Sequence, residues 1–212
     1  MATEPSHDLG FTPNPSTPPS AWQAGWHAQA RHVPSPNFGP RPAGAVIDLA
    51  IVHSISLPPG VYGGDEVERL FTNTLDWGAH PYFEQIRGAE VSSHFFIRRD
   101  GELVQFVNVN DRAWHAGKSS WQGRDNCNDH SVGIELEGLE HHPFEQVQYE
   151  ALARLLTELR GTWPIRHTVG HEHVAPGRKE DPGRAFDWAL LGLLTGWQSE
   201  QIPPLAMPPQ QA

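Results

Sequence analysis

Apolar residues gather in short runs along the chain, and the length of each run predicts a strand. Residues 46–53 (VIDLAIVH) and 131–136 (SVGIEL) are compact apolar runs that suit central strands of a sheet. Residues 165–170 read as a third, short buried strand, with Ile165 and Val169 as its apolar positions. We therefore expect a sheet built around these three segments.

Helical spacing marks three other segments. The clearest helix is predicted over 145–160, with Gly161 as its stop and one apolar stripe made by Leu152, Leu155, Leu156 and Leu159. A second helix is expected after a cap at Asp65, with its apolar positions at Val67, Leu70, Phe71 and Leu75. A third, shorter helix is expected over 184–194, with Phe186, Leu190 and Leu194 facing inward.

Turn signals and composition divide the rest of the chain. A β-hairpin is predicted where residues 94–98 and 103–107 flank Asp100-Gly101. A long loop is predicted over 108–130, because the apolar residues there follow no clear helical or strand periodicity. Residues 1–22 are rich in Pro, Ser and Thr and predict a disordered tail, 24–44 predict an irregular arm, and 198–212 predict a second tail. The domain is therefore expected at 23–197, as a mixed α/β fold with a central mixed sheet flanked by helices.

Charge and composition exclude several classes of partner. The formal net charge of −10 argues against nucleic acid and anionic membranes as binding partners. No apolar run reaches the roughly 18 residues of a membrane span, and the N-terminus carries no secretory signal pattern. The single cysteine, Cys127, excludes an internal disulfide and fits a reducing compartment. We therefore expect a cytoplasmic protein.

The stretch from Gly170 to Gly183, GHEHVAPGRKEDPG, looks like half of a metal site. Zinc takes imidazole and carboxylate ligands, and a catalytic zinc usually has three of them plus a water. His171 and Asp181 could supply two ligands, although His173 could replace His171. His53 could be the third, because it ends the first strand and would meet His171 if their strands are neighbours. A polar strand end without chemistry is the alternative for His53. On either set of ligands, the zinc would lie at one edge of the sheet.

Two charged residues could act beside such a metal. Glu135 lies on an apolar strand, where an ionised carboxylate is costly to bury unless it is paired or used. It is either the base for a metal-bound water or one half of a salt bridge at the strand end. Lys179 is either a solvated surface residue or a group that stabilises an oxyanion.

Six blocks of the chain, taken together, resemble one family. They are GWHAQARHVPSPNFGPRP, VHSISLPPGVYGG, SSHFFIRRDGELVQFV, RAWHAG, CNDHSVGIELEG and GHEHVAPGRKEDPG. The chain resembles the AmpD-type N-acetylmuramoyl-L-alanine amidases, cytoplasmic zinc enzymes that cleave anhydromuropeptides. Peptidoglycan recognition proteins and amidase-type phage lysozymes share their superfamily. The resemblance covers roughly residues 25–195.

The resemblance implies a role for each matching residue. His53, His171 and Asp181 fall on the zinc ligands, Glu135 and Lys179 on the catalytic glutamate and lysine, and Trp114 and His115 on the substrate groove. Three departures stand out: Ser54 replaces an asparagine, and Glu90 and Asn126 replace arginines that hold substrate carboxylates. The lost positive charge predicts weaker recognition of the stem peptide, not loss of hydrolysis.

The expected function is zinc-dependent hydrolysis of the amide between N-acetylmuramic acid, in its 1,6-anhydro form, and L-alanine of the stem peptide. Its place would be cytoplasmic muropeptide recycling, and the protein is expected to be a monomer that binds a small muropeptide. Two alternatives remain: a non-catalytic module that binds peptidoglycan fragments, and an amidase that acts on intact cell wall.

Overall fold

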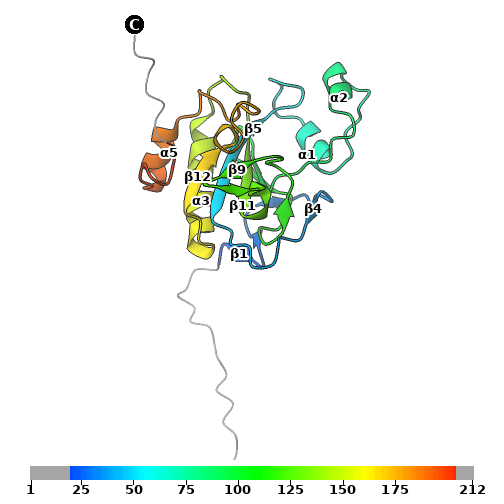
Figure 1. Cartoon of the computed structure of the whole chain (residues 1–212). Coiled ribbons are helices and arrows are strands. Elements are labelled where there is room, and N and C mark those ends of the chain that lie inside the picture. Colours follow the sequence, from blue (N-terminus) through cyan, green and yellow to red (C-terminus); the bar gives the residue numbers. More distant parts are fainter. Residues whose placement is uncertain (1–19, 204–212) are drawn as a thin grey trace, which may run out of the picture.

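A mixed β-sheet of six strands runs through the computed structural model, which describes residues 20–203 (Figure 1). The strand order is β12 (His167–Gly170), β5 (Leu49–Ile55), β11 (Ser131–Glu137), β6 (Phe95–Ile97), β7 (Leu103–Gln105) and β3 (Arg31–His32). All neighbouring strands are parallel except the β6–β7 hairpin, which is antiparallel. The mixed α/β sheet and the hairpin expected from the sequence are both confirmed.

The two faces of the sheet bury different partners. Alternate residues of β5 and β11, such as Ala50 and Ile134, form one core with the leucines of α3 (Gln146–Thr162). The intervening positions, such as Leu49 and Ile51, contact Val169 and Cys127 on the opposite face. Because successive side chains of a strand point to opposite faces, His53 and Glu135 lie on the face away from α3.

Short elements surround this sheet. Figure 1 shows α1 (Glu66–Phe71) and α2 (Pro81–Gln85) on the side of the molecule away from α3 and α5 (Trp188–Thr195). Two-residue strands form the pairs β1–β2 (Trp22–Gln23 with Trp26–His27), β4–β8 (Phe38–Gly39 with Arg112–Ala113) and β9–β10 (Ser120–Trp121 with Arg124–Asp125). The remaining elements are the 3-10 turn η1 (Cys127–Asp129) and the single-turn helix α4 (His171–Val174). The expected loop over 108–130 and the expected arm over 24–44 therefore contain short paired strands.

Several predicted boundaries are wrong. Strand β5 starts at Leu49 rather than at residue 46 and continues two residues past His53, because its neighbour β11 pairs with it as far as Ile55. Helix α1 ends at Phe71, so Leu75 packs in the core from the following turn. Gly161 does not stop α3, which runs on to Thr162.

The last helix also differs from its prediction. Helix α5 begins at Trp188, and Asp187 caps it by accepting a hydrogen bond from the backbone N–H of Leu190. Its most buried residue is Leu191, while Leu194 is 39% exposed. The most buried face of the helix consists of Trp188, Leu191 and Gly192, and Phe186 is buried just before the helix begins.

The ends of the described chain pack onto the core. Trp22 contacts the core and donates its indole N–H to the Glu158 carbonyl, and Ile202 packs near α5. The predicted tails over 1–19 and 204–212 lie outside the described residues. No helix within 20–203 combines the length and the apolar character that crossing a bilayer requires.

Candidate metal site

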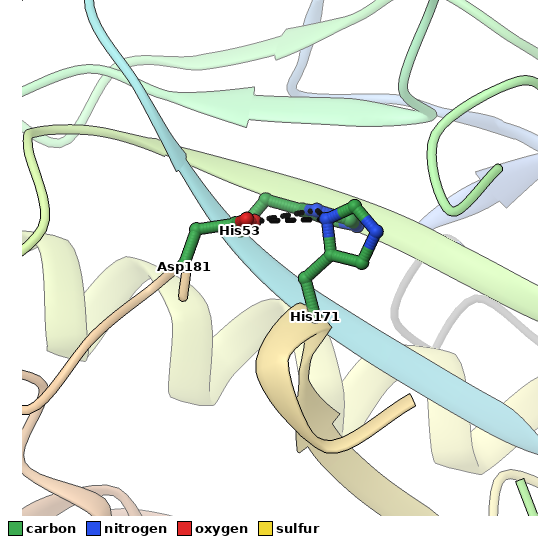
Figure 2. A group of neighbouring side chains, drawn as sticks. All are labelled: His53, His171 and Asp181. Atoms are coloured by element: carbon green, nitrogen blue, oxygen red, sulfur yellow. Dashed lines mark hydrogen bonds and ion pairs between the residues drawn. The ribbon is translucent and has the colours of Figure 1, made fainter. Parts of the chain in front are cut away.

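Three donor atoms from distant parts of the chain converge at the carboxyl end of the central strands (Figure 2). His53 comes from β5, His171 is the first residue of α4 directly after β12, and Asp181 comes from the loop that follows α4. The Nδ1 atoms of His53 and His171 are 3.0 Å apart, and Asp181 Oδ2 lies 3.0 Å from the first and 3.1 Å from the second. All three residues are buried.

This triangle of atoms fits a small divalent cation. Zinc binds imidazole nitrogen and carboxylate oxygen at about 2.0–2.2 Å, so two ligands of a tetrahedral ion lie roughly 3.3 Å apart. The observed spacings of 3.0–3.1 Å are close to that value. Two nitrogens and one oxygen also leave the fourth position that a catalytic zinc keeps for water or substrate.

The two histidines of the HEH sequence have different partners. His171 directs Nδ1 into the cluster, and its Nε2 lies 3.0 Å from the Ala116 carbonyl oxygen. His173 instead accepts a hydrogen bond at Nδ1 from the Gly170 backbone N–H, 3.0 Å away, and packs its ring against Trp188. The structure thus brings His171, and not His173, into the cluster.

Burial and mutual contacts shift the pKa values of His53 and Asp181. Burial, together with the neighbouring His171, lowers the pKa of His53 to about 4. Burial alone would raise the pKa of Asp181, but its contacts with the imidazoles of His171 and His53 hold that pKa well below its usual range. A neutral His53 imidazole beside an ionised Asp181 carboxylate matches the protonation states that metal binding requires.

Glu135 lies beside His53 in the sheet. The two residues are register partners on the parallel strands β11 and β5, so their side chains point to the same face. Burial and the charge of Asp181 raise the pKa of Glu135 well above its usual value, while Lys179 opposes the rise. The Oε2 atom of Glu135 is buried and has no hydrogen-bond partner. A buried, unpaired carboxylate oxygen is costly, which is typical of a group used in chemistry.

The neighbouring carboxylate, Glu137, has a structural part. Its oxygens accept hydrogen bonds from the backbone N–H groups of Gly63 and Arg99. Glu137 therefore fixes two loops at the end of β11. Glu135 remains available beside the cluster of His53, His171 and Asp181.

A cleft of about 470 Å³ opens over the cluster. Its lining includes the three converging residues, Glu135 and the other three predicted site residues, Lys179, Trp114 and His115. The structure thus brings all seven predicted site residues together. Apolar side chains form much of the remaining wall, among them Leu57, Leu70, Phe71, Tyr82, Ile86 and Val91.

The residues that depart from the family pattern are distributed unevenly. Ser54 lines the cleft, and Glu90 is exposed between two lining residues. Asn126 lies between β10 and η1 and is not part of this lining, so its place on the peptide-binding side stays a prediction. Within the described chain, Lys179 is the one Lys or Arg in the lining. Arg98 and Arg124 are not part of it: Arg98 donates to the Gly63 and Gly64 carbonyls, and Arg124 pairs with Asp48.

Sequence reasoning missed three residues around the site. The Asn128 side-chain oxygen accepts hydrogen bonds from the backbone N–H groups of His115 and Ala116. Ser131 contacts the His115 ring, and Gly133 leaves the space that this ring fills. A glycine inside an apolar strand is a signal of close approach by another group, and Gly133 could have been found in this way.

Comparison with known proteins gives a consistent picture. A family model described as N-acetylmuramoyl-L-alanine amidase matches residues 43–184. The 1,6-anhydro-N-acetylmuramyl-L-alanine amidase AmpD of Citrobacter freundii is 51% identical over 172 residues, which cover 80% of this chain and 92% of that protein.

Solved structures agree. A crystal structure of a selenomethionine derivative of AmpD superposes with a TM-score of 0.80 at 50% identity, covering 81% of this chain and 97% of that one. The amidase AmiD from Escherichia coli, in complex with the substrate anhydro-N-acetylmuramic acid-L-Ala-D-γ-Glu-L-Lys, has a TM-score of 0.52 at 27% identity, covering 73% of this chain and 60% of that one. With its fold, its cluster and its sequence in agreement, the chain belongs to the N-acetylmuramoyl-L-alanine amidase family.

Proposed function

We propose that this protein is a zinc-dependent amidase that hydrolyses the amide between 1,6-anhydro-N-acetylmuramic acid and the L-alanine of a stem peptide. The observation that carries the proposal is the triangle of His53, His171 and Asp181 next to an unpaired, buried Glu135. The names of the AmpD relative and the AmiD substrate complex support this choice of substrate. The residues that carry the proposal lie within the proposed amidase domain, 23–197.

His53 Nδ1, His171 Nδ1 and Asp181 Oδ2 would hold the zinc. When bound there, zinc would supply Lewis acidity that polarises the scissile carbonyl and acidifies a water. Two neutral imidazoles and one carboxylate leave a net positive charge at the ion, which is what this chemistry needs.

Glu135 is proposed as the general acid and base. It takes a proton from the attacking water and returns it to the nitrogen of the leaving L-alanine. A base that works near neutral pH benefits from a pKa above that of an ordinary carboxylate, and burial raises the pKa of Glu135 in this direction. Lys179 is close enough to favour the ionised form of Glu135.

Lys179 and Trp114 are proposed to act on the substrate. The Lys179 ammonium lines the same cleft and offers a positive charge to the oxyanion that forms when water adds to the amide carbonyl. Trp114 is partly exposed in the cleft wall, where its flat apolar face can carry the sugar ring. His115 was expected to bind substrate as well, but its contacts indicate another role that is derived below.

The defining experiment is hydrolysis of a defined anhydromuropeptide by the purified chain, with and without a chelator. Release of the intact peptide and of the anhydro sugar, detected by mass spectrometry, would support the reaction. His171→Ala should lose both zinc and turnover, while His173→Ala, the matched control, should keep its zinc. A wild-type chain without stoichiometric zinc, or with turnover that a chelator leaves unchanged, would contradict the proposal.

We place the reaction in cytoplasmic muropeptide recycling and propose that the protein acts as a monomer. The family resemblance supports the role in cytoplasmic muropeptide recycling. The presence of all seven site residues on one chain supports a monomeric enzyme. Cell fractionation and the molar mass in solution test these two points separately from the chemistry.

A further inference from the structure

A chain of hydrogen bonds leaves the metal cluster from the far side of His53. The Nε2 atom of His53 lies 3.0 Å from Nδ1 of His115. On the other side of that ring, His115 Nε2 lies 3.3 Å from the hydroxyl oxygen of Ser131. The Ser131 hydroxyl in turn donates to the Cys127 carbonyl oxygen at 2.6 Å. Four residues thus form one continuous line that ends at the backbone.

The end of this line fixes the direction of every bond in it. A carbonyl oxygen can only accept, so the hydroxyl proton of Ser131 is committed to Cys127. The Ser131 oxygen therefore accepts from His115 Nε2–H. A neutral imidazole has one N–H and one free electron pair, so His115 Nδ1 accepts from His53 Nε2–H. His53 is then left with its free electron pair on Nδ1, the atom that faces His171 and Asp181.

The loop that carries His115 is held at the required distance. Asn128 Oδ1 accepts hydrogen bonds from the backbone N–H of His115 at 3.2 Å and of Ala116 at 2.8 Å. The Ala116 carbonyl then accepts from Nε2 of His171 at 3.0 Å, which leaves Nδ1 of His171 free on the cluster side as well. One loop therefore orients both imidazoles of the cluster.

The sheet makes room for the same ring. A Cβ atom on Gly133 would lie 2.4 Å from Cγ of His115 and 2.6 Å from its Nδ1. The ring thus packs directly on the backbone of β11, beside Glu135. Both of its nitrogens are already bonded, to His53 and to Ser131, so the ring has no free polar atom for a ligand.

We propose that His115 is a positioning residue that holds His53 in the tautomer with a free electron pair on Nδ1, and so prepares the cluster to bind its metal. This inference rests on the metal site of the proposed function. It gives the Trp114–Ala116 segment a role around the metal, in place of the substrate contact expected for His115. Groups that orient a metal-binding histidine in this way typically contribute 10–100-fold to metal affinity.

The first test reads the tautomers directly in the metal-free full-length chain. Protonated and unprotonated ring nitrogens have well-separated ¹⁵N shifts, so a long-range ¹H–¹⁵N correlation spectrum at pH 7.5 assigns each proton. We expect the proton on Nε2 in both His53 and His115. A proton on Nδ1 of His115 would overturn the proposal, whether or not the protein hydrolyses any substrate.

The second test measures zinc affinity by competition with a chromophoric chelator. His115→Asn and His115→Leu have nearly the same shape, but only asparagine places an acceptor oxygen near the position of Nδ1. We expect His115→Leu to lose about 10–100-fold in zinc affinity and His115→Asn to lose less than about tenfold. Equal losses in the two variants, or a raised KM with unchanged zinc affinity, would overturn the inference.

A second pair of variants covers the case in which His115→Leu does not fold. Ser131→Ala removes the acceptor of His115 Nε2–H at a fully buried position that no substrate reaches. Ser93→Ala is the matched control, because the Ser93 hydroxyl is equally buried and has no hydrogen-bond partner. We expect about a tenfold loss of zinc affinity for Ser131→Ala and none for Ser93→Ala. Equal affinities would overturn the inference, whereas a wild-type chain that binds no zinc would refute the proposed function itself.

Discussion

Replacing Gly133 by alanine tests the close packing beside the metal cluster. An ideal Cβ at this position would lie 2.4 Å, 2.6 Å and 2.7 Å from three atoms of the His115 ring. Carbon atoms in contact prefer separations of about 3.5–4.0 Å, so the ring must move by roughly 1 Å. The backbone of Gly133 is not in the left-handed region and lies within β11, so alanine strains no dihedral angle. The effect is therefore steric.

The consequence for the metal follows from one distance. The His53 Nε2 to His115 Nδ1 separation is 3.0 Å, and a shift of about 1 Å carries it beyond the range of a hydrogen bond. We expect Gly133→Ala to weaken zinc binding by about 10–100-fold, which is about 1.4–2.8 kcal/mol. Overpacking of the buried ring should also lower the free energy of unfolding of the metal-free chain by about 1–3 kcal/mol.

Two measurements check this prediction: chelator competition for zinc, and urea unfolding of the metal-free chain. Gly39→Ala is the matched control, because Gly39 also lies in a strand, β4, and a Cβ there would meet nothing within 4 Å. The control should leave the zinc affinity unchanged and should not lower the free energy of unfolding. A Gly133→Ala protein with wild-type zinc affinity and wild-type stability would refute the packing argument.

The remaining predictions concern four other positions. Glu135→Gln should keep its zinc but slow turnover by about 10²–10⁴-fold, as expected for a lost general base; near-normal turnover in a steady-state assay would demote it to a structural carboxylate. Burial lowers the pKa of His94 to about 3 from 6.5, so between these pH values the unfolded chain takes up a proton that the folded chain does not, and stability is lost as the pH falls. In urea unfolding, the free energy of unfolding of the wild type should therefore fall by about 1.4 kcal/mol relative to that of His94→Gln for each pH unit below pH 6. A difference that does not change with pH would contradict this. Gly161→Ala should raise the unfolding free energy by about 0.5–1 kcal/mol, because Gly161 lies inside α3 with open space around it; calorimetry showing a lower Tm would contradict this. Glu90→Arg should lower KM for a muropeptide that carries the extra carboxylate of diaminopimelate more than for a shorter one at equal salt, because it adds a cation beside the cleft wall; equal effects on both substrates would show that Glu90 is remote from the peptide.

The central strands and the cluster were within reach of the sequence. Apolar runs at 46–53 and 131–136 are found as β5 and β11, because fully buried parallel strands keep an almost continuous apolar pattern. The pairing of β12 with β5 brings His171 next to His53, as the expected neighbouring strands require. The resemblance to the amidase family added the choice of His171 over His173, which residue types alone left open.

Other features depended on contacts that no local pattern contains. Gly161 has the residue type of a helix stop, yet α3 continues for one more residue, to Thr162. Some of the two-residue strands in 24–44 and 108–130 are defined by partners far away in the chain: β3 pairs with β7, and β4 pairs with β8. The part played by His115 depends on Ser131, Cys127 and Asn128 together, and no spacing in the sequence reveals the direction of their hydrogen bonds.

The three residues of the cluster stand on backbone of unequal stiffness. His53 lies within β5, which β12 and β11 flank on either side, whereas Asp181 follows five consecutive exposed residues, 176–180. Segments with few buried contacts open with far less free energy than the strands of a core. An ion at this site would therefore exchange through release of Asp181 while both imidazoles keep their places. Metal exchange would then proceed at its own rate, independent of the slow global opening of the sheet.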